Sequence, residues 1–209
     1  MKKLLLSAFV ICLAGTSIAQ ESPLWMRHCA LSPDGTTIAF TYKGDIYTVP
    51  STGGRATQIT TNPAFDTEPV WSPDSKQIAF ASDRMGSLDV FVVSSEGGAP
   101  QRLTTHSGSE KPVAYKDNKH ILFTANIAPS AEDAGFPSGQ FQQVYEVAVT
   151  GGRPAMFSSM PMECISINKE GVMLYQDKKG YEDYWRKHQV SPIARDIWTY
   201  TPGKKPVYQ

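Results

Sequence analysis

Residues 70–84, VWSPDSKQIAFASDR, decide the fold, because imperfect copies of this stretch recur along nearly the whole chain. Residues 69–72 are expected to form a strand and residues 73–75 a tight turn, and alternating apolar residues after the turn predict a second strand. Proline presets φ at the second position of a turn, and aspartate bonds to nearby backbone. The stretch therefore predicts a β-hairpin, with Asp74 as a turn former rather than a catalytic acid.

Three signals of this kind return in a fixed order. The turn recurs as SPDG at 32–35, SPDS at 72–75, KDN at 116–118 and NKEG at 168–171. A strand with alternating bulky residues follows as GDIYTVP at 44–50, LDVFVVS at 88–94, QVYEVAV at 143–149 and RDIWTYT at 195–201. Glycine turns come third, at 53–54, 97–98, 151–152 and 203. Such ordered recurrence indicates one structural unit repeated along the chain.

The spacing of the copies identifies the unit. Pro33 and Pro73 lie 40 residues apart, and Gly53 and Gly97 lie 44 apart. A period of this length with four short strands is typical of a β-propeller blade. We therefore expect an all-β chain of about four four-stranded antiparallel blades, which cover residues 24–61, 66–105, 110–158 and 162–209.

The third and fourth units are longer than the first two, and the extra residues fall between their second and third strands. Residues 126–141 read as an irregular loop, and residues 177–194 as an insertion with a short helix that ends before Pro192. In an antiparallel meander both insertions emerge on one face. The second insertion concentrates aromatic and charged groups, which makes these residues the candidate partner or substrate loop: Tyr184, Trp185, Arg186 and His188. The alternative is a structural plug, with Trp185 packed on a blade edge.

Composition excludes several classes of function. Lys plus Arg and Asp plus Glu are balanced at 20 each, so nothing indicates binding to nucleic acid.

Residues 1–19 resemble a secretory signal peptide, with cleavage expected after Ala19. Cys12 raises lipoprotein processing as an alternative, but the bulky Ile11 before it disfavours this. No later apolar stretch has the length of a membrane span, so we expect no membrane insertion after cleavage.

The remaining cysteines and the histidines indicate neither a disulfide nor a metal site. Cys29 and Cys164 fall in the first strands of the first and fourth units, so they are expected to be too far apart to pair, and buried and reduced. The four histidines lack ligand spacing, and no cofactor is expected.

No motif predicts nucleophilic catalysis in this chain. Residues 135–139 match G-x-S-x-G only in spacing, without the strand and helix that the motif requires. Asp83 and Arg84, beside Asp89, are expected to make an exposed and weak loop ion pair or a strand-end hydrogen bond. We therefore assign no catalytic residue.

The repeats resemble the WD-like propeller repeats of the TolB and tricorn peptidase families. The resemblance rests on S-P-D-G-x-x-I-A-F, D-I-Y-x-V and G-G-x-x-x-x-L-T, and residues 181–200, YEDYWRKHQVSPIARDIWTY, are similar to the N-terminal propeller of bacterial tricorn protease homologues. Complete members of that family are long exported serine peptidases with two propellers, a PDZ-like domain and a C-terminal catalytic domain. The resemblance implies six blades where this chain holds about four, and thus part of a larger propeller.

The resemblance implies a function as well. The chain is expected to be the N-terminal propeller portion of an exported, periplasmic or extracellular serine peptidase, where it filters or docks peptide or protein substrates while catalysis resides elsewhere. It allows an oligomer formed through the full-length protein. One alternative is a stand-alone periplasmic TolB-like propeller that binds proteins without enzymatic activity. Another is the propeller of a prolyl oligopeptidase-like enzyme.

Overall fold

The computed structural model describes residues 25–127, 142–160, 162–168, 170–176, 196–204 and 207–208, which contain strands and no helix. Blade 1 contains β1 (Arg27–Leu31), β2 (Thr37–Tyr42), β3 (Asp45–Pro50) and β4 (Thr57–Gln58). Blade 2 contains β5 (Asp66–Trp71), β6 (Gln77–Ser82), β7 (Asp89–Ser94) and β8 (Gln101–Arg102). Blade 3 contains β9 (Glu110–Asp117), β10 (His120–Ala125), β11 (Gln143–Ala148) and β12 (Ala155–Ser158). Blade 4 contains β13 (Glu163–Ile167), β14 (Met173–Gln176), β15 (Ile197–Tyr200) and β16 (Val207–Tyr208).

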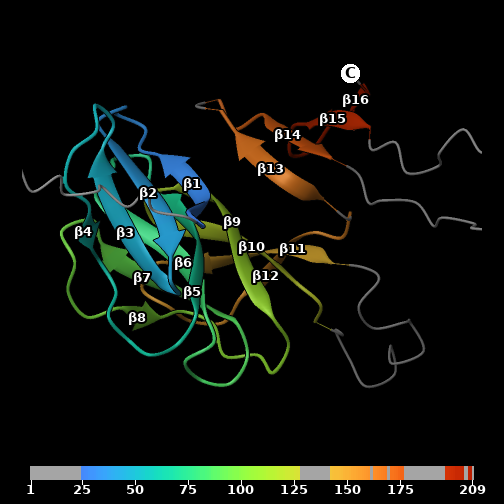
Figure 1. Ribbon diagram of the computed structural model, residues 1–209. Coiled ribbons are helices and arrows are strands. Elements are labelled where there is room, and N and C mark those ends of the chain that lie inside the picture. The colour runs from blue at the N-terminus through green and yellow to red at the C-terminus, as the bar shows by residue number, and fades with distance from the viewer. Residues whose placement is uncertain are drawn as a thin grey trace, which may run out of the picture.

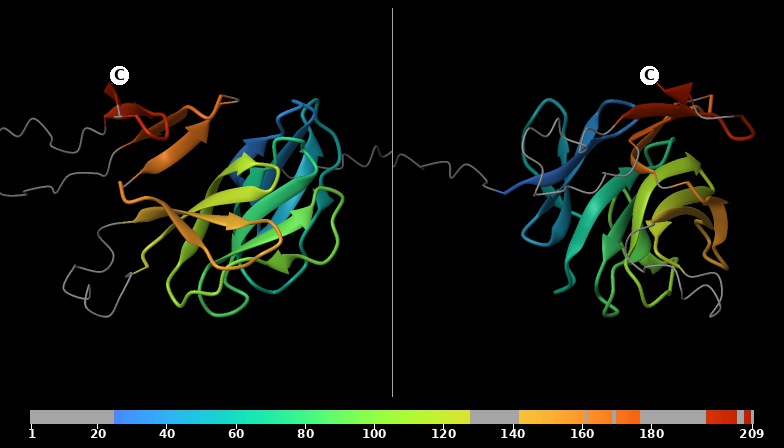
Figure 2. Two further views of the ribbon diagram at one scale, coloured as in Figure 1. Left: turned by 180° about the vertical axis from the view of Figure 1, so that it is seen from behind. Right: turned by 90° about the vertical axis from the view of Figure 1, so that its right-hand side faces the viewer.

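Each blade is a four-stranded antiparallel meander, because every strand pairs with its neighbour in sequence. Figures 1 and 2 show the four sheets following one another in chain order, from the blue first blade to the orange and red fourth. The predicted all-β propeller of about four blades is confirmed.

The hairpin of residues 70–84 forms as predicted, with strand bounds displaced by a few residues. β5 begins at Asp66 rather than at residue 69, and it ends at Trp71. Pro69 is accommodated because β5 is the edge strand of its sheet, where a missing N–H breaks no pairing on the outer side. In the adjoining pair β6–β7, Phe80 lies directly opposite Phe91, and their rings stack with centroids 5.9 Å apart.

The first strand of a blade carries a recurrent β-bulge. Its pairing shifts register in all four blades. In blades 1, 2 and 4 one non-glycine residue of the bulge has a positive φ, namely His28 at 50°, Glu68 at 55° and Cys164 at 52°. Pro112 takes the corresponding place in blade 3, where its ring prevents a positive φ. The bulge is therefore a property of the blade, and proline changes its form in one copy.

The prediction for the cysteines is half right. Cys29 and Cys164 are free, as expected, and each lies in the first strand of its blade. Both are exposed, so the prediction that they are buried is wrong. The physical reason is the bulge, which interrupts the alternation of buried and exposed side chains next to Cys29 and at Cys164 itself.

The hydrophobic core lies between blades and not within them. One cluster joins blades 1 and 2 through Ile46 and Phe80, a second joins blades 2 and 3 through Val90 and Phe123, and a third joins blades 3 and 4. β6 and β10 are buried along almost their whole length, whereas β1 and β15 are largely exposed or half-buried. Blades 2 and 3 are thus covered on both faces.

Candidate functional site

The two ends of the blades differ in what they present. One end, which we call the turn face, carries the connections between first and second strands; the other, the loop face, carries the connections between second and third strands and between blades. The strands that flank both long insertions are the second and third of their sheets, as predicted. The candidate residues of the second insertion lie outside the described ranges: Tyr184, Trp185, Arg186 and His188.

The turn face is built from hydrogen-bonded aspartate turns. Asp74 Oδ1 accepts a bond from Ser72 Oγ at 2.7 Å and another from the Lys76 N–H at 3.1 Å. These bonds, the first above all, hold the pKa of Asp74 below its ordinary value. Its interpretation as a turn former is confirmed, and Asp34 makes the same contacts with Ser32 and Thr36 in blade 1.

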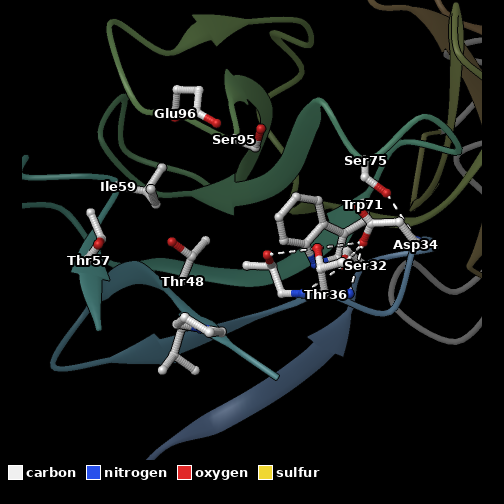
Figure 3. Close-up of a pocket in the computed structure, with 13 residues that line it drawn as sticks. Ser32, Asp34, Thr36, Thr48, Thr57, Ile59, Trp71, Ser75, Ser95 and Glu96 are labelled. Atoms are coloured by element: carbon white, nitrogen blue, oxygen red, sulfur yellow. Dashed lines mark hydrogen bonds between the residues drawn. The ribbon is translucent and has the colours of Figure 1, made fainter. Parts of the chain in front are cut away.

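A pocket of about 360 Å³ lies beside these turns, between blades 1 and 2 (Figure 3). The Asp34 N–H donates to Ser75 Oγ at 3.3 Å across the junction, and Trp71 Nε1 donates to the Ala30 carbonyl at 2.9 Å. Asp34 and Trp71 thus already have partners within the protein. The pocket is therefore part of the junction between the two blades and a weak candidate for a ligand-binding site.

The loop face holds a buried ion pair in blade 2. Arg84 donates to both carboxylate oxygens of Asp66 at 3.0 Å, and the Asp66 side chain is fully buried. The guanidinium carbon lies 4.5 Å from the ring centroid of Phe91 and 5.5 Å from that of Phe80. The predicted ion pair of Arg84 therefore exists, but the prediction that it is exposed and weak is wrong.

Asp83, the neighbour of Arg84, has a different role. Its Oδ1 accepts a bond from the Phe65 N–H at 2.7 Å, which fixes the chain as it enters β5. This is the strand-end hydrogen bond that was the other expectation for the pair. Asp66, the partner that Arg84 selects, precedes it by 18 residues and was not singled out from the sequence.

A threonine bond joins strand 3 to the end of the same blade. In blade 1 the Ile46 N–H donates to Thr60 Oγ1 at 3.0 Å, and in blade 2 the Val90 N–H donates to Thr104 Oγ1 at 2.9 Å. Thr60 also donates to Asp45, whose pKa is raised mainly by burial and further by the nearby Asp66 charge. Asp45 and Thr60 thus recur in blade 2 as Asp89 and Thr104, at the same offset of 44 residues.

Two further carboxylates, Asp89 of blade 2 and Glu110 of blade 3, interact with each other. Asp89 and Glu110 are both fully buried, and Arg102 approaches Asp89 Oδ2 at 2.8 Å. Glu110 Oε2 accepts a long 3.4 Å bond from the His106 N–H, and the Thr104 hydroxyl and the Asp89 side chain also interact with Glu110. Glu110 Oε1 has no hydrogen-bond partner among the described residues. Burial foremost, with the neighbouring Asp89, raises the pKa of Glu110 above its ordinary value of 4.5.

Glu110 borders a hollow between blades 2 and 3 with a volume of about 460 Å³, which we call the inter-blade hollow. The residues that line it come from the blade 2 to blade 3 connection and from blade 3: Thr105, His106, Glu110, Ile127, Tyr145, Arg153, Pro154 and Met156. The Gly108 N–H donates to His106 Nδ1 at 3.0 Å, which fixes the orientation of the imidazole ring. The hollow combines apolar walls with the carboxyl group of Glu110 and the guanidinium of Arg153.

Other chemistries find little support in the part of the chain that the structure describes. No group of three or more His, Cys, Asp or Glu side chains there is arranged to hold a metal ion. None of its segments is a helix long and apolar enough to cross a membrane.

Four-stranded meanders that pack face to face, with cores only at their junctions, define the β-propeller class. The family model described as the tricorn protease N-terminal β-propeller domain matches residues 23–209, and the chain belongs to this family. This confirms the resemblance to the tricorn propeller.

Several named proteins are similar in sequence. The chain is 39% identical over 77 residues to tricorn protease homolog 1 of Streptomyces coelicolor, and 32% identical over 108 residues to the uncharacterized peptidase YuxL of Bacillus subtilis. These matches cover 37% and 46% of this chain, but only 7% and 16% of the two relatives. A putative tricorn-like protease N-terminal subunit of Sulfurisphaera tokodaii is 21% identical over 189 residues, which cover 86% of this chain and 90% of that protein.

Solved structures show the same fold. The tricorn protease superposes with a TM-score of 0.64 at 16% identity, over 90% of this chain and 18% of the other. A putative TolB of Agrobacterium tumefaciens gives 0.63 at 21% identity, over 86% of this chain and 64% of the other. At these identities the likeness concerns the fold alone.

Proposed function

We propose that this chain is the N-terminal propeller portion of an exported tricorn-like serine peptidase, where it filters or docks peptide substrates. The observation that carries the proposal is the family match over residues 23–209. Under this proposal the serine nucleophile belongs to another part of the peptidase. Residues 1–19 then direct export to the periplasm or the extracellular space, with cleavage after Ala19.

The loop face is the proposed docking surface. Both long insertions connect second to third strands, and these connections share that face. Binding residues concentrate on loops that a rigid scaffold positions. We therefore assign peptide contact to the aromatic and charged residues of the second insertion: Tyr184, Trp185, Arg186 and His188.

The proposal is tested by separating binding from hydrolysis. The full chain is titrated against a fluorescent tryptic digest of casein, and hydrolysis of the same peptides is followed by mass spectrometry. We expect binding without cleavage. The variant Trp185→Ala is expected to weaken binding, whereas Trp25→Ala, a matched change outside the insertion, is expected to leave it unchanged. Peptide cleavage that a serine-directed inhibitor blocks would place catalysis in this chain and refute the proposal.

A stand-alone TolB-like binding propeller is the second candidate function. The observation in its favour is the shared fold with two TolB structures, of which the Acinetobacter baumannii protein superposes with a TM-score of 0.59. This candidate predicts capture of folded proteins rather than short peptides. Pull-down with a folded periplasmic extract and with its proteolytic digest distinguishes the two: retention only from the undigested extract favours the TolB-like role.

A further inference from the structure

Blade 2 contains a complete arginine-binding frame that is filled by its own Arg84. The frame consists of a buried carboxylate at the start of the first strand, Asp66, the hydroxyl of Ser82, which accepts a bond from Arg84 Nε at 2.8 Å, and two stacked rings, Phe80 and Phe91. Arg84 lies two residues after the end of β6, bonds both oxygens of Asp66 at 3.0 Å and covers the ring of Phe91 at 4.5 Å. Arg84 Nη2 donates to both oxygens, and such charge-assisted bonds together with ring stacking are contacts that suit a guanidinium.

Blade 3 repeats the carboxylate and the rings of this frame, but it has Ala125 where blade 2 has Ser82, and it lacks the arginine. Glu110 is the first residue of β9 and pairs with Ala125, as Asp66 pairs with Ser82. The Phe123 and Tyr145 rings stack with centroids 5.7 Å apart, against 5.9 Å in blade 2. Two residues after the end of β10, where blade 2 has Arg84, the chain carries Ile127. The carboxylate and the rings are therefore present, but no cation of the described residues takes the place that Arg84 has in blade 2.

The structure leaves an open space beside Glu110. Glu110 and Tyr145 both border the inter-blade hollow of about 460 Å³, and Ile127 and Met156 add apolar wall. Glu110 Oε1 is buried and has no hydrogen-bond partner in the part of the chain that the structure describes. Arg102, the nearby arginine of blade 2, approaches Asp89 at 2.8 Å instead. A buried carboxylate without a cation is costly, so it favours a ligand that supplies one.

Blade 1 shows that the rings alone do not define the frame. Phe40 and Tyr47 also stack, with centroids 5.9 Å apart. The residue before β1 is Met26, and Gly44 lies two residues after the end of β2. The stacked rings are thus a feature of blade packing, and only Glu110 turns them into a receptor for a cation.

We propose that the inter-blade hollow binds an arginine side chain of a peptide, with Glu110 in the role that Asp66 has for Arg84. The inference rests on the proposed docking function, and it names arginine as one peptide side chain that the docking surface recognises. The apolar wall suits the methylene stem of arginine, while Glu110 receives its guanidinium. Arg153 also lines the hollow, and its charge suits the carbonyl oxygens that a peptide carries beside its arginine.

The test uses three short peptides and the full chain. The first is the blocked pentapeptide acetyl-Ala-Ala-Arg-Ala-Ala-amide, the second carries citrulline in place of arginine, and the third is unblocked penta-alanine. Citrulline keeps the shape but lacks the charge, and penta-alanine offers only a terminal ammonium. Isothermal titration should show binding of the arginine peptide with at least about tenfold preference over the other two, the scale of one charge-assisted contact.

Variants connect binding to the frame. Glu110→Gln removes the carboxylate, and Ile127→Arg places an arginine of the chain itself at the corresponding position. Both variants should bind the arginine peptide about tenfold or more weakly than the unchanged protein. Ile127→Arg should also keep or raise the urea midpoint, which a merely damaged fold would not do. Glu96→Gln is the matched control, because Glu96 is exposed beside the turn-face pocket, and it should leave affinity unchanged.

The outcomes separate this inference from the docking proposal. Equal affinity for the arginine and citrulline peptides, or unchanged affinity in a folded Glu110→Gln protein, overturns the arginine site. If the casein digest binds but the arginine peptide does not, the arginine site is wrong and the docking function stands. If neither binds, both are wrong.

Discussion

At the scale of single residues, burial decides what each charge contributes. The sequence places Asp83 and Arg84 side by side, yet Arg84 reaches Asp66, whose side chain is fully buried. Lys116 and Glu146 form a pair of similar distance, 2.7 Å, but they are far more exposed. Buried pairs are costly to break because the remaining charge stays in a poor solvent, whereas exposed pairs contribute little.

Arg84→Ala tests this difference. The change leaves Asp66 buried without its cation and removes the contact with Phe91, so we expect a loss of about 3 kcal/mol in the free energy of unfolding. Lys116→Ala, the exposed control, should cost less than about 1 kcal/mol. Urea unfolding followed by circular dichroism measures both. Equal losses in the two variants would show that the Asp66 pair is no more important than a surface pair.

The raised pKa of Glu110 gives stability a definite dependence on pH. The folded protein holds this proton more tightly than the unfolded chain, so the contribution of Glu110 is fully present below the ordinary pKa of 4.5. It is lost as pH rises through the folded pKa. Glu110→Gln cannot ionise and should therefore gain stability relative to wild type as pH increases from 4.5 to 7 in a series of urea titrations. A constant difference across this range would contradict the shift.

At the scale of elements, the sequence predicts the blades and misses their bulges. The SPDG and SPDS turns and the alternating apolar residues identify hairpins, because these signals are local. The bulge at His28, Glu68 and Cys164 depends on pairing with the next strand and on no local motif. For this reason the exposure of Cys164 was predicted wrongly.

The bulge predicts a stabilising substitution. His28 has a φ of 50°, a conformation that glycine adopts with less strain than other residues. His28→Gly should therefore raise the free energy of unfolding, by up to about 1 kcal/mol. Arg27→Gly, one residue earlier in β1, only adds backbone entropy to the unfolded chain, so this variant should have a lower free energy of unfolding. Thermal denaturation of both variants gives the comparison, and a lower midpoint for His28→Gly would count against a strained bulge.

The candidate site illustrates the same limit of sequence reasoning. Asp66 and Glu110 begin corresponding strands, and Thr60 and Thr104 precede them by the same six residues. That repetition was available in the sequence, position by position. What the sequence alone does not show is that these carboxylates are buried, because their burial depends on the packing of one blade against the next.

At the scale of the whole molecule, stability resides in the junctions. Each of the three core clusters joins two consecutive blades, as expected for an array in which neighbours supply the packing. The aspartate turns add cross-links at the same junctions, since the Asp34 N–H bonds to Ser75 and the Asp74 N–H bonds to Asn118. Blades 2 and 3, with both faces covered, are therefore the most constrained.

Hydrogen exchange tests this gradient across the molecule. Amides of β6 and β10 should exchange slowest, because these strands are buried and paired on both sides. Amides of β15 should exchange faster, since none of its side chains is fully buried. Mass spectrometry of peptic fragments resolves the two regions, and uniform protection would indicate one cooperative unit instead of a graded array.

Arg84 and its frame suggest how an array of duplicated blades acquires new specificities. In blade 2 the frame is occupied by a side chain from the same blade, so it only stabilises. In blade 3 the position of Arg84 holds Ile127, while a buried carboxylate and a stacked pair of rings remain as Glu110, Phe123 and Tyr145. A substitution between arginine and an aliphatic residue at this one position therefore changes an internally occupied site into an open one, or the reverse. Because the blades are repeated, one copy can change in this way while another keeps the internal ion pair that stabilises the fold.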